Sequence, residues 1–217
     1  MEFERTERKF SAAEVADFFG VPEVTQRDWR RRETNGDWET SGKPVFRPAH
    51  RGKKFQFTLN EACALAIAKI MIDNGKPVGA ALWVARMYAP LAVLQIELCQ
   101  VGVHFEGIDP NPTDTRSLIY QLNGVPDTEV ISERSPTRFL FFPAPKVSKD
   151  ADLLAHGISN PEKQATAQCF ASLSEMESNV TGGWAYGSIM DLVGFAMGLS
   201  IGLQKPIITY RLVEDGE

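Results

Sequence analysis

The sequence has few of the residues that mark a metal site or a disulfide framework. Its 217 residues include three histidines and three cysteines. Cys63, Cys99 and Cys169 lie far apart among apolar neighbours, and none belongs to a CxxC pair or a Cys/His cluster. This spacing argues against structural disulfides and against a metal cofactor. We expect three buried free thiols.

The sequence also lacks an arrangement of residues typical of catalysis. His104 and His156 are isolated, and no serine stands in a GxSxG setting. Gly182 and Gly183 are not followed by the lysine that a phosphate-binding loop requires, so we interpret them as a turn before a helix. We therefore predict that the protein is not an enzyme and uses no cofactor.

No segment is typical of secretion or of a membrane span. The first ten residues, MEFERTERKF, are charged and contain no apolar stretch. The apolar residues 186–203 carry only Asp191 as a charge, but this segment is slightly short and has no flanking positive charge. We expect a cytoplasmic protein without a membrane partner.

Positive charge is concentrated in one part of the chain. Apolar residues make up 43% and charged residues 24% of the sequence, as in soluble globular proteins, and the net charge of −5 alone argues against a nucleic-acid partner. Residues 27–54, however, contain nine Lys or Arg against four Asp or Glu, a net charge of +5 that leaves −10 for the rest. A local basic patch of this kind favours contact with a polyanion.

Residues 10–32, FSAAEVADFFGVPEVTQRDWRRR, predict a helix-turn-helix. Ser11 and Glu14 have the spacing of a capping box, so a helix should begin at about Ala12. Gly20 suits the left-handed residue at its end. A second helix should begin near Pro22 and end in a basic cluster.

The segment after the second helix predicts a basic β-ribbon. Residues 44–46 and 54–57 have the composition of two short strands. The turn between them carries Arg47, His50, Arg51, Lys53 and Lys54, which would lie along a phosphate backbone.

The next part of the chain predicts three helical segments. Thr58 and Glu61 form a second capping box before an apolar helix that Gly75 ends. A shorter helix should begin at Pro77 and break at Pro90. Beyond it, apolar residues three and four apart resemble a short coiled-coil seam, which would pack against a second copy or inside the same chain.

The C-terminal half predicts a small α+β domain. We expect a helix over 118–122, a hairpin of strands 129–132 and 138–142, and a helix from Asn160 with Phe170 on its apolar stripe. A last helix over 186–203 has a glycine ridge on one face, formed by Gly194, Gly198 and Gly202. This ridge would pack within the chain or against a second subunit. A final strand, 206–213, is expected beside strand 138–142.

From Ser11 to about Val101 the chain resembles the winged-helix DNA-binding domain of the MerR family of bacterial transcription regulators. The family has a Gly-Val turn followed by a threonine, an arginine, an aromatic residue and a further arginine. The residues that carry the resemblance are Gly20, Val21, Thr25, Arg27, Trp29, Arg31, Phe57, Thr58, Leu65, Met71, Gly75, Val78 and Ala81. Gln26 departs from the pattern, because the family usually places leucine or isoleucine there.

The resemblance implies a homodimer that binds inverted repeats in double-stranded DNA. The expected fold is mainly α with small β elements, divided into a winged helix-turn-helix domain (1–88), a linker and dimerisation helix (89–102) and an α+β effector or oligomerisation domain (103–217). A small molecule and a protein are both open as its ligand. The expected DNA contacts are Thr25, Gln26, Arg27, Trp29, Arg30, Arg31, Arg47, Arg51, Lys53 and Lys54, and the expected dimer contacts are Leu91, Leu94, Leu98 and Val101.

Two other functions are compatible with the same sequence. A phage or mobile-element accessory protein, of the excisionase or packaging type, would keep the DNA contact but act at an attachment or packaging site. A protein-interaction module that has lost DNA binding would keep the fold alone. The basic stretch favours the transcription regulator over this last alternative.

Overall fold

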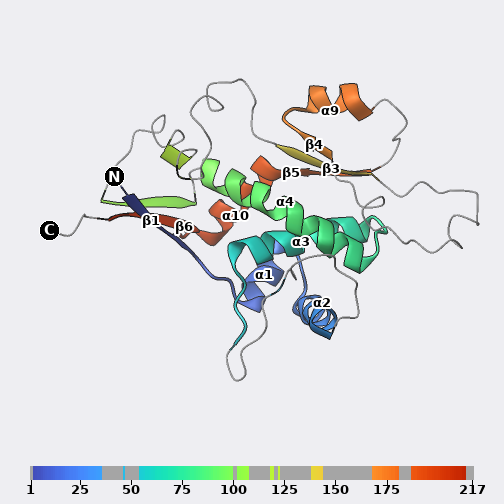
Figure 1. Ribbon diagram of the computed structural model, residues 1–217, viewed down its shortest axis with the longest axis horizontal. Helices are drawn as coiled ribbons and strands as arrows, with labels where there is room; N and C mark the ends of the chain where they lie inside the picture. Colours follow the sequence, from blue (N-terminus) through green and yellow to red (C-terminus); the bar gives the residue numbers. More distant parts are fainter. Residues whose placement is uncertain are drawn as a thin grey trace, which may run out of the picture.

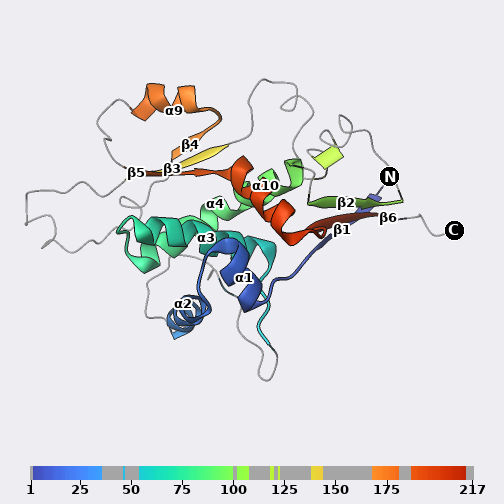
Figure 2. The same ribbon diagram turned by 180° about the vertical axis from the view of Figure 1, so that it is seen from behind.

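The computed structural model describes residues 2–35, 46, 54–99, 102–107, 118–119, 122, 138–143, 168–180 and 187–213. Within these residues the fold is mainly helical with two small sheets, as the sequence predicts (Figure 1). Helices α1 and α2 lie on one side of the central helices, and one small sheet lies on the other side in both views (Figures 1 and 2).

Two apolar helices, α3 (Leu59–Asp73) and α4 (Val78–Leu98), form the centre of the molecule. The predicted capping box starts α3: the Thr58 hydroxyl accepts the Glu61 N–H at 3.2 Å, and the Glu61 carboxylate accepts the Thr58 N–H at 2.7 Å. Asn74 caps the end of α3, and Gly75 follows with a φ of 81° that glycine adopts without strain. The chain can then reverse so that α4 packs along α3.

The predicted break at Pro90 is wrong, because α4 continues through it to Leu98. A proline inside a helix removes one backbone hydrogen bond and crowds the preceding turn. Ala89, Ala92 and Ile96 on the same helix are fully buried, and this packing offsets the cost of the proline. The expected linker helix is therefore the second half of α4.

α1 (Ala12–Phe19) is built as the sequence predicts. The Ser11 hydroxyl accepts the Glu14 N–H at 3.2 Å, and the Glu14 carboxylate accepts the Ser11 N–H at 2.8 Å. Gly20 ends the helix with a φ of 69°. α2 (Glu23–Asn35) follows after Val21 and Pro22.

Strand β1 (Glu2–Glu7) pairs antiparallel with β6 (Ile208–Val213), and β2 (Val103–Glu106) pairs parallel with β6 on its other edge. The final strand was predicted correctly, but its expected neighbour was wrong. β3 (Phe139–Pro143) instead lies between β4 (Gln168–Phe170) and β5 (Gly187–Asp191) in a second, antiparallel sheet. The other predicted hairpin strand, 129–132, lies outside the described residues.

Two predicted helices differ from the structure in their described residues. Residues 160–167 of the first lie outside the described residues, and its expected member Phe170 is in a strand. Phe170 lies in β4, and α9 (Leu173–Val180) follows it. Residues 187–191 form β5, and Asp191 ends that strand and caps α10 (Leu192–Leu203) by accepting the N–H groups of Val193 and Gly194. A capping carboxylate at this position separates the strand from the helix. Of the residues of the predicted helix 118–122, the described Leu118, Ile119 and Leu122 are helical.

The glycine ridge of α10 packs closely against another helix at one of its glycines. A side chain at Gly202 would lie 3.3 Å from the Phe18 ring of α1, so this glycine lets the two helices approach closely. A side chain at Gly198 would have no neighbour within 4 Å among the described residues. The ridge therefore packs within the chain at Gly202 and leaves Gly198 uncovered.

One cluster of buried apolar side chains extends through α1, α3, α4, α10 and β6. Residues from both ends of the sequence thus share a core, while the three-part division of the chain stays a prediction. The cysteines are free, but only Cys63 is buried as expected; Cys99 is half-buried and Cys169 is exposed on the edge strand β4. Burial raises the pKa of the Cys63 thiol.

Among the described helices, α4 has the length and composition of a membrane span. Its most apolar window is 44% buried inside the fold, where it packs against α3 and α10. A core helix of a soluble protein passes the same test, so this helix is only weak evidence for a membrane span. α10 is shorter than a bilayer requires.

Candidate nucleic-acid interface

The angle between α1 and α2 is held by a buried glutamine. Gln26 is 2% exposed, and its side-chain amide donates to the carbonyl of Ala12 at 2.9 Å and to that of Val21 at 2.6 Å. One bond reaches the start of α1 and the other reaches the turn between the helices. Gln26 therefore fastens α2 to α1, which is the task of the apolar residue expected at this position.

The inner face of α2 is completed by an aromatic ring and a carboxylate. Trp29 is 5% exposed and belongs to the core cluster. The Glu33 carboxylate accepts the backbone N–H of Phe46 at 2.9 Å, which brings Phe46 against the helix. Gln26, Trp29 and Glu33 lie three and four positions apart, so they form one stripe of α2 that faces the core.

The opposite stripe of α2 carries exposed side chains, which we call the outer face: Val24, Arg27 and Arg31. Their spacing of three and four residues places them on one side of the helix. Asp28 lies beside them and forms ion pairs with Arg31 at 3.1 Å and with Arg32 at 3.0 Å. The outer face is therefore basic, with one carboxylate that neutralises part of its charge.

Arg30 lies at the edge of α2 toward the segment 54–57. Its guanidinium stacks over the Phe55 ring, 4.1 Å from the ring centre. Burial lowers the pKa of Arg30, the charge of Arg27 lowers it further, and Glu61 opposes the shift. A guanidinium nevertheless stays charged at neutral pH, so Arg30 is a cation fixed in position by an aromatic ring.

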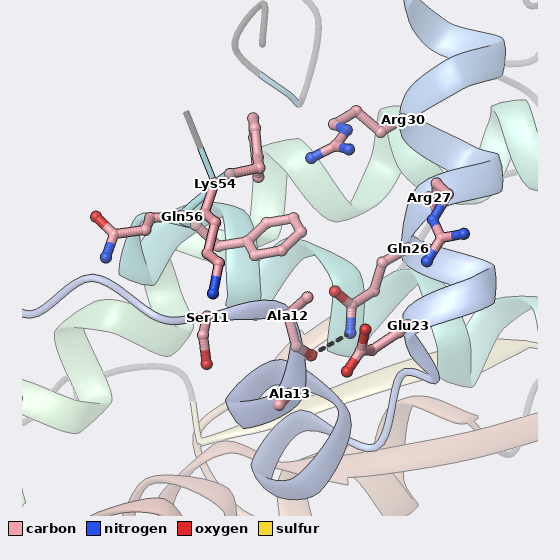
Figure 3. Close-up of a pocket in the computed structure, with 11 residues that line it drawn as sticks. Ser11, Ala12, Ala13, Glu23, Gln26, Arg27, Arg30, Lys54 and Gln56 are labelled. Atoms are coloured by element: carbon pink, nitrogen blue, oxygen red, sulfur yellow. Dashed lines mark hydrogen bonds between the residues drawn. The ribbon is translucent and has the colours of Figure 1, made fainter. Parts of the chain in front are cut away.

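A hollow of about 420 Å³ lies between the start of α1, the side of α2 and the segment 54–57 (Figure 3). Arg27, Arg30 and Lys54 line it together with one carboxylate, that of Glu23. The three positive charges outnumber the negative one, so the hollow favours an anionic group such as a phosphate.

The structure brings most of the described candidate residues into this one region. Thr25 is half-buried, Arg27 and Arg31 are exposed, and Lys54 is exposed across the hollow from α2. Trp29, also an expected DNA contact, packs inside the core. Three further candidates, Arg47, Arg51 and Lys53, lie outside the described residues.

Gln26, one of the expected DNA contacts, is turned away from the outer face. Its side chain is enclosed between α1 and α2 by its bonds to Ala12 and Val21. Its Oε1 atom is buried and has no hydrogen-bond partner among the described residues. The orientation of the amide is fixed because both of its bonds need an N–H donor.

The predicted ribbon strand over residues 54–57 does not form. Phe57 makes a single β-bridge with Phe10, in which the two residues exchange N–H···O bonds of 2.8 and 2.9 Å. This bridge joins the residue before α1 to the residue before the α3 cap. Its register holds Lys54 and Phe55 beside α2.

Sequence reasoning missed Val24, which lies on the outer face and is 73% exposed. A single apolar residue in the first turn of a helix gave no reason to single it out. The helical spacing to Arg27 would have placed the two side chains on one stripe.

The predicted dimer residues are placed as follows. Leu91 packs against the core cluster, and Leu94 and Leu98 are half-buried on the second half of α4. Val101 lies outside the described residues. The described residues contain no group of three or more His, Cys, Asp or Glu side chains that could hold a metal ion.

No protein-family model matches the chain, and no curated protein matches it.

Proposed function

We propose that the protein is a DNA-binding transcription regulator that resembles the MerR family and acts as a homodimer. The observation that carries the proposal is the α1–turn–α2 unit, in which one stripe of α2 is fastened to the core and the opposite stripe exposes Arg27 and Arg31. A helix held in this way can enter the major groove with its outer face toward the bases.

Positively charged side chains beside both ends of α2 could contact the DNA backbone on either side of the major groove. Arg30 and Lys54 lie at the hollow, where a phosphate would meet two cations close to the start of α1. Arg32 is 47% exposed at the other end of α2. Contacts of this kind fix the position of a protein on the duplex without reading its sequence.

A salt titration with two matched arginine variants tests the proposal. Arg31 and Arg211 are 68% and 64% exposed, and each forms one ion pair with a carboxylate, Asp28 and Glu106 respectively. Arg31 lies on α2, whereas Arg211 lies on β6, which Figure 1 shows at another end of the molecule. Either change to alanine removes the same charge from a similar surface setting.

Binding of a fluorescent duplex should respond only to the change on α2. We expect Arg31→Ala to weaken binding and to reduce the slope of log K against log salt by about 0.9, the value for one lost phosphate contact. Arg211→Ala should retain the slope and affinity of the parent protein. Equal effects of the two variants would mean that only overall charge matters, and would refute α2 as the interface.

The same measurement distinguishes the alternatives. No affinity for DNA at low salt would favour a protein-interaction module. If DNA binds, footprinting on genomic fragments separates a regulator, which protects promoters, from a phage or mobile-element accessory protein, which protects an attachment or packaging site.

The dimer is supported by the half-buried leucines of α4. Leu98→Lys should shift the protein toward the monomer in sedimentation velocity, because a charged side chain would be desolvated in a coiled-coil seam. A parent protein that sediments as a monomer at the concentrations used for DNA binding would contradict the dimer.

A further inference from the structure

Val24 is the most exposed of the large apolar side chains that the structure describes, at 73%. It is the second residue of α2, at the end of the helix nearest the turn. Exposed apolar side chains are common on protein surfaces and need no special explanation when they occur alone. Val24 is not alone, because it shares the outer face with Arg27 and Arg31.

Local stability gives no reason for a valine at this position. A β-branched side chain is stiff in a helix and has a lower helix propensity than alanine or the long polar residues. With 73% of its surface in water, Val24 also contributes little to the core. The residue thus combines a modest cost to the helix with an exposed apolar group on a basic stripe.

The major groove contains one apolar group that such a side chain could contact, the C5-methyl group of thymine. The first residues of a recognition helix are those closest to the base edges. We propose that Val24 reads a thymine methyl group in the major groove, an inference that rests on the DNA-binding function proposed above. It makes Val24 a specificity-determining residue that the basic stretch alone would not suggest.

Arg27 supplies the second half of the recognition element. It lies one turn after Val24, about 4.5 Å along the helix axis, which is similar to the spacing of about 3.4 Å between neighbouring base pairs. An exposed arginine at this place suits the O6 and N7 acceptors of guanine. The outer face therefore selects a thymine and a guanine on neighbouring base pairs of each half-site.

The test begins with selection of bound duplexes from a random pool by the full-length parent protein. Each thymine of the selected half-site is then replaced by deoxyuridine, which removes only the methyl group. At one thymine we expect the replacement to weaken parent binding about fourfold, the worth of one buried methyl group. For Val24→Ala, the same replacement should leave DNA affinity almost unchanged. At the remaining thymines, replacement should change the affinity of Val24→Ala as much as it changes that of the parent protein.

Ile201→Ala is the matched control. Ile201 is 61% exposed on α10, and its replacement removes apolar surface away from α2. This variant should show the deoxyuridine pattern of the parent protein. Far-UV circular dichroism should show the same helix content for all three proteins, because alanine is the better helix former at either position.

Two negative results have different meanings. If the parent protein selects no sequence, DNA reading as a function fails. If it selects a sequence but Val24→Ala keeps the full deoxyuridine effect at every thymine, the DNA-binding function stands and the role of Val24 is refuted. Retention of the parent's preferred sequence by Val24→Ala, with unchanged affinity, would refute it as well.

Discussion

Replacing Gln26 by leucine should leave the fold almost as stable as the parent protein. The side chain is buried and polar, and its two hydrogen bonds join α2 to Ala12 and Val21. A polar residue that links two helices would ordinarily be expected to be costly to remove. The expectation here is different because the same side chain carries a buried Oε1 atom without a partner among the described residues.

The contributions can be compared one by one. Losing the bond to Ala12 costs about 1 kcal/mol, and leaving the Val21 carbonyl without this donor costs about 1 to 3 kcal/mol. Removing the unpaired Oε1 atom returns about 1 to 3 kcal/mol, since that atom was desolvated without compensation. The two larger contributions offset each other, so Gln26→Leu should be destabilised by only about 1 kcal/mol.

Gln26→Ala is the contrasting variant, because it loses the same bonds and also leaves a cavity. Large-to-small changes at buried positions cost about 2 to 5 kcal/mol, so this variant should be clearly less stable than Gln26→Leu. Urea unfolding followed by circular dichroism and tryptophan fluorescence measures both, and coincident curves show that one transition is observed. A loss of more than about 3 kcal/mol in Gln26→Leu, equal to that of Gln26→Ala, would refute the reasoning.

Three further changes have defined outcomes. Asp28→Asn should raise DNA affinity in an anisotropy titration by up to about fivefold, because Arg31 loses a competing ion pair worth under about 1 kcal/mol. In urea unfolding, Arg5→Met should be less stable than Glu97→Gln. Arg5→Met leaves the fully buried Glu97 carboxylate without its arginine, whereas Glu97→Gln leaves an Arg5 side chain that is 32% exposed to water. The opposite order of stability would contradict this reasoning. The hydrogen bond from the Ser11 backbone lowers the pKa of Glu14 below its usual 4.5, burial opposes the shift, and the Ser11 hydroxyl and Arg8 lower it further. The advantage of the parent over Glu14→Gln should therefore be complete above pH 4.5 and disappear as the pH falls through the lowered value, and a constant difference across an acid titration would refute the link.

Local signals in the sequence predicted the starts of two helices correctly. Ser11 and Thr58 each stand three residues before a glutamate, and both capping boxes form as expected. Such patterns succeed because the donor and acceptor lie within one turn of the same chain segment. Gly20 likewise has the left-handed conformation that the sequence predicted for the end of the first helix.

Long-range pairing could not be predicted in the same way. The strand over residues 208–213 was expected, but its partners β1 and β2 lie about 200 and 100 residues away in the sequence. Alternation of side chains marks a strand without saying which other strand it meets. A related limit explains Pro90, whose cost to α4 is offset by tertiary packing against the neighbouring helix α3 and the distant helix α10.

The candidate site was only partly predictable. Arginine positions in the sequence identified the basic helix, and the structure places Arg27 and Arg31 on its outer face. Gln26 was listed among the DNA contacts for its place in the second helix, although the family usually has an apolar residue at this position. A glutamine can be buried where carbonyl groups accept its N–H donors, and Ala12 and Val21 provide those acceptors only after the turn has formed.

The pairing of β1 with β6 has a consequence for the order in which the protein can form during synthesis. Residues 2–7 leave the ribosome about 200 residues before their partner, residues 208–213. The α1–α2 unit, which follows β1 directly, can become helical early but cannot be anchored on that side until translation has passed residue 213. Ribosome-bound chains that stop before β6 should therefore expose an unpaired strand to chaperones and proteases. The sheet that joins β1 to β6 can therefore form only after β6 has been translated.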